Sequence, residues 1–159
     1  MRIESRLAEM GLELPEPMQL PPGVSLPFPW VRILGDRAFV SGHGPLMRDG
    51  SLPSVLGKVG AEVSQSEAYD AARSTALAVL ASLRAALGDL DRVVAWLRVF
   101  GMVNAAPGFT SAPAVVNGFS DLILELWGPE AGSHARSAVG LAELPFRIPV
   151  EIEAEVLIR

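Results

Sequence analysis

The chain has 159 residues and half of them are hydrophobic, which fits one globular domain and excludes a disordered chain. It contains no cysteine and only two histidines, which excludes disulfides, thiolate catalysis, iron–sulfur clusters and zinc–thiolate sites. The formal net charge of −5 comes without a basic stripe and argues against nucleic acid as a partner.

Neither the start of the chain nor its apolar runs indicate export or a membrane. Residues 1–10 carry charged side chains throughout, namely Arg2, Glu4, Arg6 and Glu9, which a secretory signal would lack. No apolar run is long enough to cross a bilayer. We therefore expect a cytoplasmic protein without a membrane partner.

The first residues are expected to form a short helix and an extended segment. Ile3–Met10 has amphipathic spacing and is followed by Gly11, which predicts a helix that ends at this glycine. Leu14–Pro29 is rich in proline and is predicted to lie extended over the body of the protein. We treat 1–29 as an N-terminal extension and 30–159 as the domain itself.

A hairpin and a loop are predicted next. Trp30–Leu34 and Arg37–Ser41 read as strands on either side of Gly35-Asp36, a pair that suits a tight turn. Met47–Lys58 lacks a periodic pattern and is expected to be an exposed excursion.

The first long helix has clear end signals. Ser64 and Glu67 have the spacing of a capping box, and Gly88 marks the end of the helix. Helical spacing predicts a buried face made of Ala68, Ala72, Thr75, Ala76, Val79, Leu80, Leu83 and Leu87.

A strand and a second helix follow. Val93–Val103 is apolar at almost every position, which predicts a central strand covered on both faces. The second helix is predicted to begin at Pro113, a favoured first-turn residue, and to end at Trp127, before Gly128-Pro129. Its buried stripe is expected to be Val115, Val116, Phe119, Leu122, Ile123 and Leu126.

Two strands, at 135–142 and 149–158, are predicted to close the chain. In the last strand apolar residues alternate with Glu151, Glu153 and Glu155, so the glutamates share one face. A solvated sheet face fits this pattern, and so does a face that lines a polar pocket or a subunit interface.

The sequence contains few candidate catalytic residues. The sequence lacks glycine-rich phosphate loops and the G-x-S-x-G nucleophile motif. His43 lies between two glycines, where it is either open to a ligand or bonded to nearby backbone. His134 lies two residues before Arg136 and is more typical of a surface residue than of a catalyst.

Arg136 opens a strand of small residues that leads through a Leu-Pro turn into the glutamate-rich strand. We expect this arginine and Glu151 to lie on adjacent strands. Taken alone, such an arginine–glutamate pair is most often structural.

These closing motifs resemble the signature of the RidA/YjgF family, and the likeness covers most of Trp30–Ile158. The stretches that carry the signature are Ala135-Arg136-Ser137-Ala138-Val139, Leu144-Pro145 and Val150-Glu151-Ile152-Glu153-Ala154. Similar to further family motifs are Phe39-Val40-Ser41-Gly42 and Val116-Asn117-Gly118. One branch of the family has a chorismate-mutase-like label, and its motifs are similar to Gly57-Lys58-Val59-Gly60 and to the stretch from Val103 to Phe109.

The resemblance implies a chorismate-mutase-like α+β fold, with a mixed sheet that carries two helices on one face. It also implies a homotrimer in which three sheets form a central barrel and a pocket lies at each subunit interface. The family's best-understood reaction is hydrolysis of reactive 2-imino acids to 2-oxo acids and ammonia, without cofactor or metal. The expected partner is therefore a small carboxylate metabolite.

Roles follow from motif position. Arg136 would hold the substrate carboxylate through two parallel hydrogen bonds, and Glu151 would orient or deprotonate the attacking water. Trp30 and His43 stand where the family more often has tyrosine and glutamine, and they would line the same pocket. The remaining pocket residues implied by the resemblance are Ser41, Gly42, Asn117 and Ala138.

Three other functions stay open at this stage. A chorismate-mutase-like enzyme would need more cations around a dicarboxylate, with Arg32, Arg98 and Arg147 as the candidates. An endoribonuclease or translation inhibitor is disfavoured by the acidity of the chain. A metabolite-binding protein without catalysis would use the same pocket.

Overall fold

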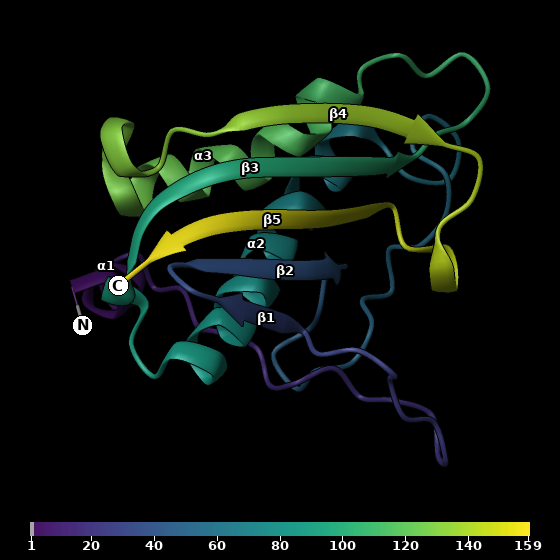
Figure 1. Cartoon of the computed structure of the whole chain (residues 1–159). Helices are drawn as coiled ribbons and strands as arrows, with labels where there is room; N and C mark the ends of the chain where they lie inside the picture. Colours follow the sequence, from purple (N-terminus) through teal and green to yellow (C-terminus); the bar gives the residue numbers. More distant parts are fainter. Residues whose placement is uncertain (1) are drawn as a thin grey trace.

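The computed structural model describes residues 2–159 as an α+β fold built on one mixed sheet (Figure 1). The helices are α1 (Arg2–Glu9), α2 (Gln65–Leu87) and α3 (Ala112–Ala131), with single 3-10 turns at Leu90–Arg92 and Pro145–Arg147. The strands are β1 (Val31–Leu34), β2 (Arg37–His43), β3 (Val93–Asn104), β4 (Ala135–Leu141) and β5 (Val150–Ile158).

The strands lie in the order β1-β2-β5-β3-β4. Neighbouring strands pair antiparallel except β3 and β4, which are parallel and are connected through α3. In Figure 1, α2 and α3 lie side by side behind the sheet, while no helix covers the face toward the viewer. The uncovered side is called the open face below.

The core lies between the two long helices and the sheet. Every residue that helical spacing placed on the buried faces of α2 and α3 is buried, so both predictions are confirmed. The capping box at Ser64 and Glu67 is present, and Gly88 ends α2 with a left-handed φ of 82°. Gly128 departs from helical geometry, with φ 78° and ψ 176°, and one further turn then ends α3 at Ala131.

The N-terminal residues take part in the same structure. Ile3 and Leu7 of α1 are buried in the core. Residues 14–30, called the strap below, have no regular secondary structure and lie on the β1 side of the sheet (Figure 1). The predicted extended segment is interrupted by a turn, in which the amide of Val24 donates to the carbonyl of Pro21 at 3.1 Å. The amides of Glu16 and Gln19 donate to the carbonyls of Arg48 and Gly50 at 2.8 and 3.0 Å.

The loop over residues 47–58 is therefore less exposed than its composition predicted. It has no regular secondary structure, but Gly50 is buried because the backbone of Pro17 lies directly above it. A side chain at position 50 would collide with this backbone. The strap therefore covers part of the 47–58 loop, which the sequence predicted to be exposed.

Two expectations about the sheet are wrong. β3 is covered by helices on one face only, and Arg98, Phe100 and Met102 of β3 share the open face with the glutamates of β5. β4 and β5 are not adjacent, because β3 lies between them. Chain order placed the last two strands together, whereas β5 inserts between β2 and β3 and leaves β4 at the edge.

Candidate active site

A pocket of about 980 Å³ brings together four of the residues expected at the site: Trp30, Gly42, His43 and Glu151. The strap forms one wall and α2 forms another. Because α2 covers one face of the sheet and Glu151 starts from the other, the pocket reaches both faces at the end of β2, where Gly42 and His43 lie. We call it the glutamate pocket.

Glu151 is the carboxylate of this pocket whose environment favours the neutral form. Burial raises its pKa above the ordinary value, and the neighbouring charge of Glu153 raises it further. Gly42 makes room for the carboxylate, because a Cβ atom at this glycine would lie 2.9 Å from Glu151 Oε2. A carboxylate with a raised pKa suits proton transfer in water near neutrality.

His43 forms part of the pocket wall and both its ring nitrogens have partners. Nδ1 lies 2.6 Å from the carbonyl oxygen of Ser41, and Nε2 lies 2.8 Å from the hydroxyl of Ser82. The ring is 5% exposed and stacks at a tilt on Trp30, with centroids 4.8 Å apart. Burial lowers the pKa of His43, so the neutral ring that donates to Ser41 and accepts from Ser82 is favoured.

Ser41 turns toward the strap rather than toward open pocket space. Its hydroxyl donates to the carbonyl of Pro29 at 2.8 Å, and its amide donates to the carbonyl of Trp30 at 2.9 Å. These bonds fix the strap at the point where Trp30 enters the pocket.

Arg136 is held elsewhere, between β4 and α3. Its Nη1 donates to Asn117 Oδ1 at 2.9 Å and to Ser120 Oγ at 3.1 Å, and its Nη2 donates to the Pro113 carbonyl at 3.3 Å. These oxygens are all neutral, and within residues 2–159 no carboxylate forms an ion pair with Arg136. The guanidinium is oriented but keeps its charge available for an anion.

His134 extends this arrangement, which we call the arginine cluster. Its Nε2 lies 2.9 Å from Ser120 Oγ, and its Nδ1 lies 2.7 Å from the Gly132 carbonyl. Burial lowers the pKa of His134, with a smaller contribution from the charge of Arg136. A neutral ring then donates from Nδ1 to Gly132 and accepts the Ser120 proton, which leaves the serine lone pairs for Arg136.

The glutamate pocket and the arginine cluster lie apart within one chain. Val99 of β3 pairs with both Arg136 and Ala154, so Arg136 lies two strands across and three residues along from Glu151. That is roughly 10 Å in each direction. Arg136 also faces the helices, whereas Glu151 starts from the open face. Ala138 follows Arg136 on the helix side and packs against the core.

Two other motifs from the sequence serve a structural purpose. The ammonium of Lys58 donates to Asn104 Oδ1 at 2.9 Å and to the Ala142 carbonyl, and Asn104 Nδ2 donates to the Ile148 carbonyl at 3.3 Å. The Gly57–Gly60 stretch and the end of β3 therefore tie the loop before β5 in place.

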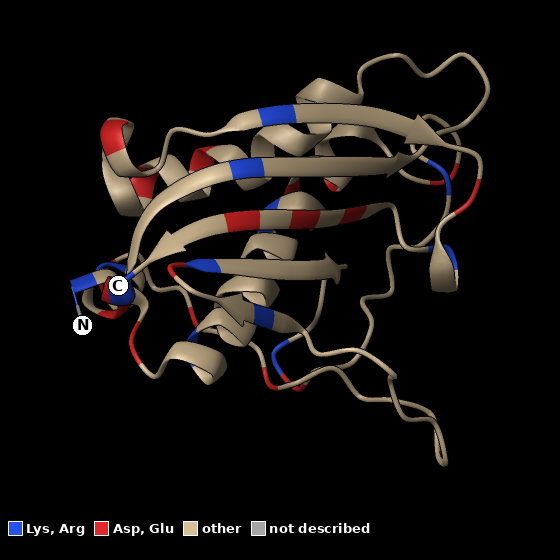
Figure 2. Ribbon diagram, in the orientation of Figure 1, with Lys and Arg blue, Asp and Glu red and all other residues tan. Residues whose placement is uncertain are grey.

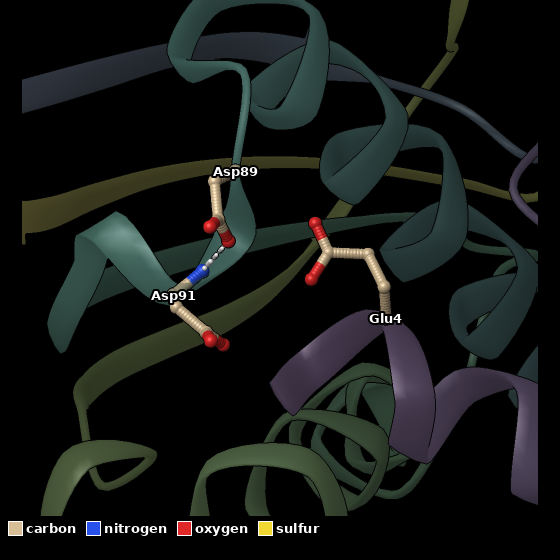
Figure 3. Close-up of side chains that lie close together, drawn as sticks. All are labelled: Glu4, Asp89 and Asp91. Carbon is tan, nitrogen blue, oxygen red and sulfur yellow. Dashed lines mark hydrogen bonds between the residues drawn. The ribbon is translucent and has the colours of Figure 1, made fainter. Parts of the chain in front are cut away.

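An acidic cluster lies at the other end of the molecule, where Glu4, Asp89 and Asp91 approach one another (Figure 3). Asp89 accepts from the amide of Asp91 at 2.8 Å. Asp91 accepts from the amides of Arg2 and Ile3, and Glu4 accepts from the amide of Leu90 at 3.0 Å. The cluster thus caps α1 and joins it to the turn before β3.

Sequence reasoning missed Ser120 and undervalued His134. Ser120 follows Asn117 by three residues, a spacing that places two helical side chains on the same side. With Arg136 already proposed as the anion-binding group, that spacing could have identified Ser120. The strap carries no sequence motif that would have predicted its place as an apolar wall of the glutamate pocket.

The family model described as "YjgF/chorismate_mutase-like, putative endoribonuclease" matches residues 4–148. The chain belongs to this family. Among its relatives, Protein TCP17 from Trypanosoma cruzi is 45% identical over 122 residues, which are 77% of this chain and 75% of the relative.

Two solved structures agree with the fold along almost the whole chain. Protein Atu1372 from Agrobacterium tumefaciens, described as of unknown function, is 39% identical with a TM-score of 0.85, covering 98% of this chain and 91% of its own. A protein from Shewanella oneidensis described as a putative endoribonuclease is 33% identical with a TM-score of 0.86, covering 98% and 99%. None of the helices within residues 2–159 has the length and hydrophobicity that a bilayer crossing requires.

Proposed function

We propose that this YjgF-family protein is a RidA-like deaminase that hydrolyses reactive 2-imino or enamine acids to 2-oxo acids and ammonia. The observation that carries the proposal is the Arg136 guanidinium, held by three neutral oxygens and without a carboxylate partner among the described residues. Such an oriented cation is a receptor for a substrate carboxylate.

Glu151 supplies the proton transfers. Water attacks the substrate C2, the electron pair of the C=N bond moves to nitrogen, and Glu151 takes a proton from the water. The protonated Glu151 returns that proton to the nitrogen of the carbinolamine. The hydroxyl proton of the carbinolamine then passes through Glu151 to the amine nitrogen, the C–N bond breaks with its electron pair on nitrogen, ammonia leaves and the hydroxyl oxygen becomes the carbonyl of the 2-oxo acid. The half-buried position and raised pKa of Glu151 suit both its uptake and its return of the proton.

The complete site is proposed to form between two copies of the chain. Within one chain Arg136 and Glu151 start from opposite faces of the sheet and lie roughly 10 Å apart both across and along the strands, so a single small substrate does not reach both. A second copy can bring its glutamate pocket to the arginine cluster of the first. This geometry supports the homotrimer with interfacial pockets that the family resemblance implies.

A coupled assay tests the activity. An amino-acid oxidase or a pyridoxal-phosphate dehydratase generates the 2-imino acid, and its decay is timed with and without the protein. Arg136→Ala is expected to lower kcat/KM at least about 30-fold, because loss of a desolvated charged contact costs roughly 2–5 kcal/mol. Arg136→Lys keeps the charge but not the planar fork, and an intermediate loss is expected.

Arg48→Ala is the matched control, because Arg48 is an exposed arginine that belongs neither to the arginine cluster nor to the glutamate pocket. Circular dichroism and light scattering on every variant separate loss of function from loss of folding. Imine decay that the wild-type protein does not accelerate contradicts the proposal. Tight binding of 2-oxo acids without turnover would instead identify a metabolite-binding protein.

RNA belongs in the same experiment because the family description includes the word endoribonuclease. The net charge of −5 predicts weak attraction to phosphates. Highly purified protein whose RNA cleavage depends on Arg136 would favour that function over imine hydrolysis.

A further inference from the structure

The glutamate pocket is much larger than a small imino acid requires. Its volume of about 980 Å³ lies at the upper end of the range of roughly 300–1,000 Å³ that holds drug-sized ligands. An imino acid of three or four carbon atoms would leave most of this space unfilled.

The additional space is apolar because of the side chains on both sides of it. From α2 the pocket receives Ala78, Ala81 and Ala85, whose short side chains leave the volume open. The strap faces them with Leu14, Leu20, Leu26 and Phe28. Phe28 and Leu20 are 47% and 37% exposed, an arrangement that leaves apolar surface in contact with water until a ligand covers it.

The polar groups of the pocket are few, and several already have partners. His43 and Ser82 bond to each other, and Arg84 pairs with Glu4 at 3.6 Å. Two carboxylates line the pocket, Glu16 from the strap and Glu151 from β5, and Glu151 is the one that lies against Gly42 and whose pKa burial raises. The pocket therefore combines the proton-transfer group Glu151 with a long apolar wall.

We propose that this wall receives the side chain of the substrate, so that the preferred substrates are 2-imino or enamine acids with large apolar side chains. This inference rests on the proposed function, since it assigns the substrate class of the same site. Each additional buried methylene strengthens binding about fourfold, so a pocket of this size discriminates strongly in favour of the larger substrate.

A substrate series tests the preference. Imines generated from alanine, leucine and phenylalanine are compared at the wild-type protein. The expected kcat/KM for the phenylalanine-derived imine exceeds that for the alanine-derived imine by about tenfold or more. Equal or reversed preference, with clear hydrolysis of the alanine-derived imine, overturns the inference and leaves the proposed function standing.

Filling the pocket gives a second measurement. Ala81→Leu, or Ala85→Leu at a more exposed position of α2, is expected to lower the phenylalanine-to-alanine ratio of kcat/KM at least about tenfold. Ala8→Leu is the control, because it makes the same change on α1, outside the pocket. A ratio that stays at the wild-type value in both pocket variants contradicts the assignment.

Binding separates the two proposals if turnover is absent. Phenylpyruvate is expected to bind at least about tenfold more tightly than pyruvate in a calorimetric titration, and Ala81→Leu is expected to remove that difference. Tight phenylpyruvate binding without imine hydrolysis would refute the deaminase and support the apolar pocket. Equal affinities would refute the pocket assignment whatever the activity.

Discussion

Glu151 shows at the level of one residue how position changes chemistry. Three glutamates share the open face of β5, and their succession is visible along this strand in Figure 2. Glu155 pairs with Arg37 at 2.6 Å, Glu153 is exposed, and Glu151 enters the pocket. The solvated face and the pocket-lining face suggested by the sequence are thus both present on one strand.

The pH dependence of wild-type activity follows from the raised pKa of Glu151. In the proposed mechanism the ionised form of Glu151 is the base that accepts the water proton, so kcat/KM is expected to rise with pH through this pKa. Removing the neighbouring charge with Glu153→Gln is expected to move the rise to lower pH. A profile that Glu153→Gln leaves unchanged would show that another group controls the rate.

Stability is expected to show the opposite trend at the same residue. A carboxyl whose pKa is higher in the folded than in the unfolded chain destabilises the fold once it ionises. Its contribution is fully present below the ordinary glutamate pKa and is lost as pH rises through the folded value. Glu151→Gln should therefore match wild-type Tm near pH 4 and exceed it near pH 8, while activity falls. Equal Tm differences at both pH values would contradict the burial of this charge.

In the proposed site, Ser120 and His134 are expected to position Arg136 rather than contact the substrate. Ser120→Ala removes one of three oxygens that hold the guanidinium, and a rise in KM of about 3–10-fold with a smaller change in kcat is expected. His134→Phe should have a similar but weaker effect, because it acts through the serine hydroxyl.

A double-mutant cycle tests this order of action. The Ser120→Ala, His134→Phe variant should be no worse than Ser120→Ala alone, since His134 has lost the group through which it acts. Additive effects of the two changes on KM would contradict the chain from His134 through Ser120 to Arg136. Tm values identify any variant whose folding is impaired.

At the scale of elements, α3 directs three consecutive residues toward three different neighbours. Val116 covers β3 so closely that a side chain at Gly101 would overlap it. Asn117 holds Arg136 of β4, and Gly118 touches the backbone of Tyr69 on α2. These three residues, Val116, Asn117 and Gly118, therefore join α3 to the sheet, to the arginine cluster and to the neighbouring helix.

Gly118→Ala tests this close helix approach. The new Cβ atom would overlap the Tyr69 carbonyl, which is backbone and cannot turn away, so the two helices must separate. Overpacking of this kind costs about 1–3 kcal/mol, which lowers Tm by several degrees. Ser66→Ala, at an exposed position of α2, serves as control. A Tm equal to that of wild type would show that α2 and α3 are free to move apart.

At the scale of the whole molecule, the open face is a large surface that no helix covers. It carries apolar side chains between its charges, including Phe39 at 40% exposure and Val139 at 38%. Surfaces of this kind on soluble proteins are commonly covered by another copy of the chain. Light scattering is expected to give a particle of three 16.9 kDa chains, and a monomer at micromolar concentration would contradict the shared site.

Mixing two inactive variants tests whether the site is shared. Arg136→Ala chains keep a normal glutamate pocket, and Glu151→Gln chains keep a normal arginine cluster. Refolded together, they are expected to form some interfaces with both intact parts and to regain about a quarter of wild-type activity. The two variants refolded separately are the control. No recovery in mixed trimers would place the whole site within one chain.

The sequence by itself determined the local structure of this protein. Caps such as Ser64 with Glu67, and the periodic apolar residues of α2, α3 and β5, depend on side chains a few positions apart, so they can be read without a fold. The same holds for the family motifs around Arg136 and Glu151. These motifs indicated the fold and named the residues of the candidate site.

Only the tertiary structure decided which of those residues meet. Strand order depends on pairing between distant segments, and no local pattern shows that β5 lies between β2 and β3. That insertion places β3 between Arg136 and Glu151, the register of the strands puts their side chains on opposite faces, and the helices cover β3 on one face only. The strap likewise creates the apolar pocket because it lies opposite α2, an arrangement of residues far apart in the chain. Local chemistry thus supplied the groups, and long-range packing set the distances between them.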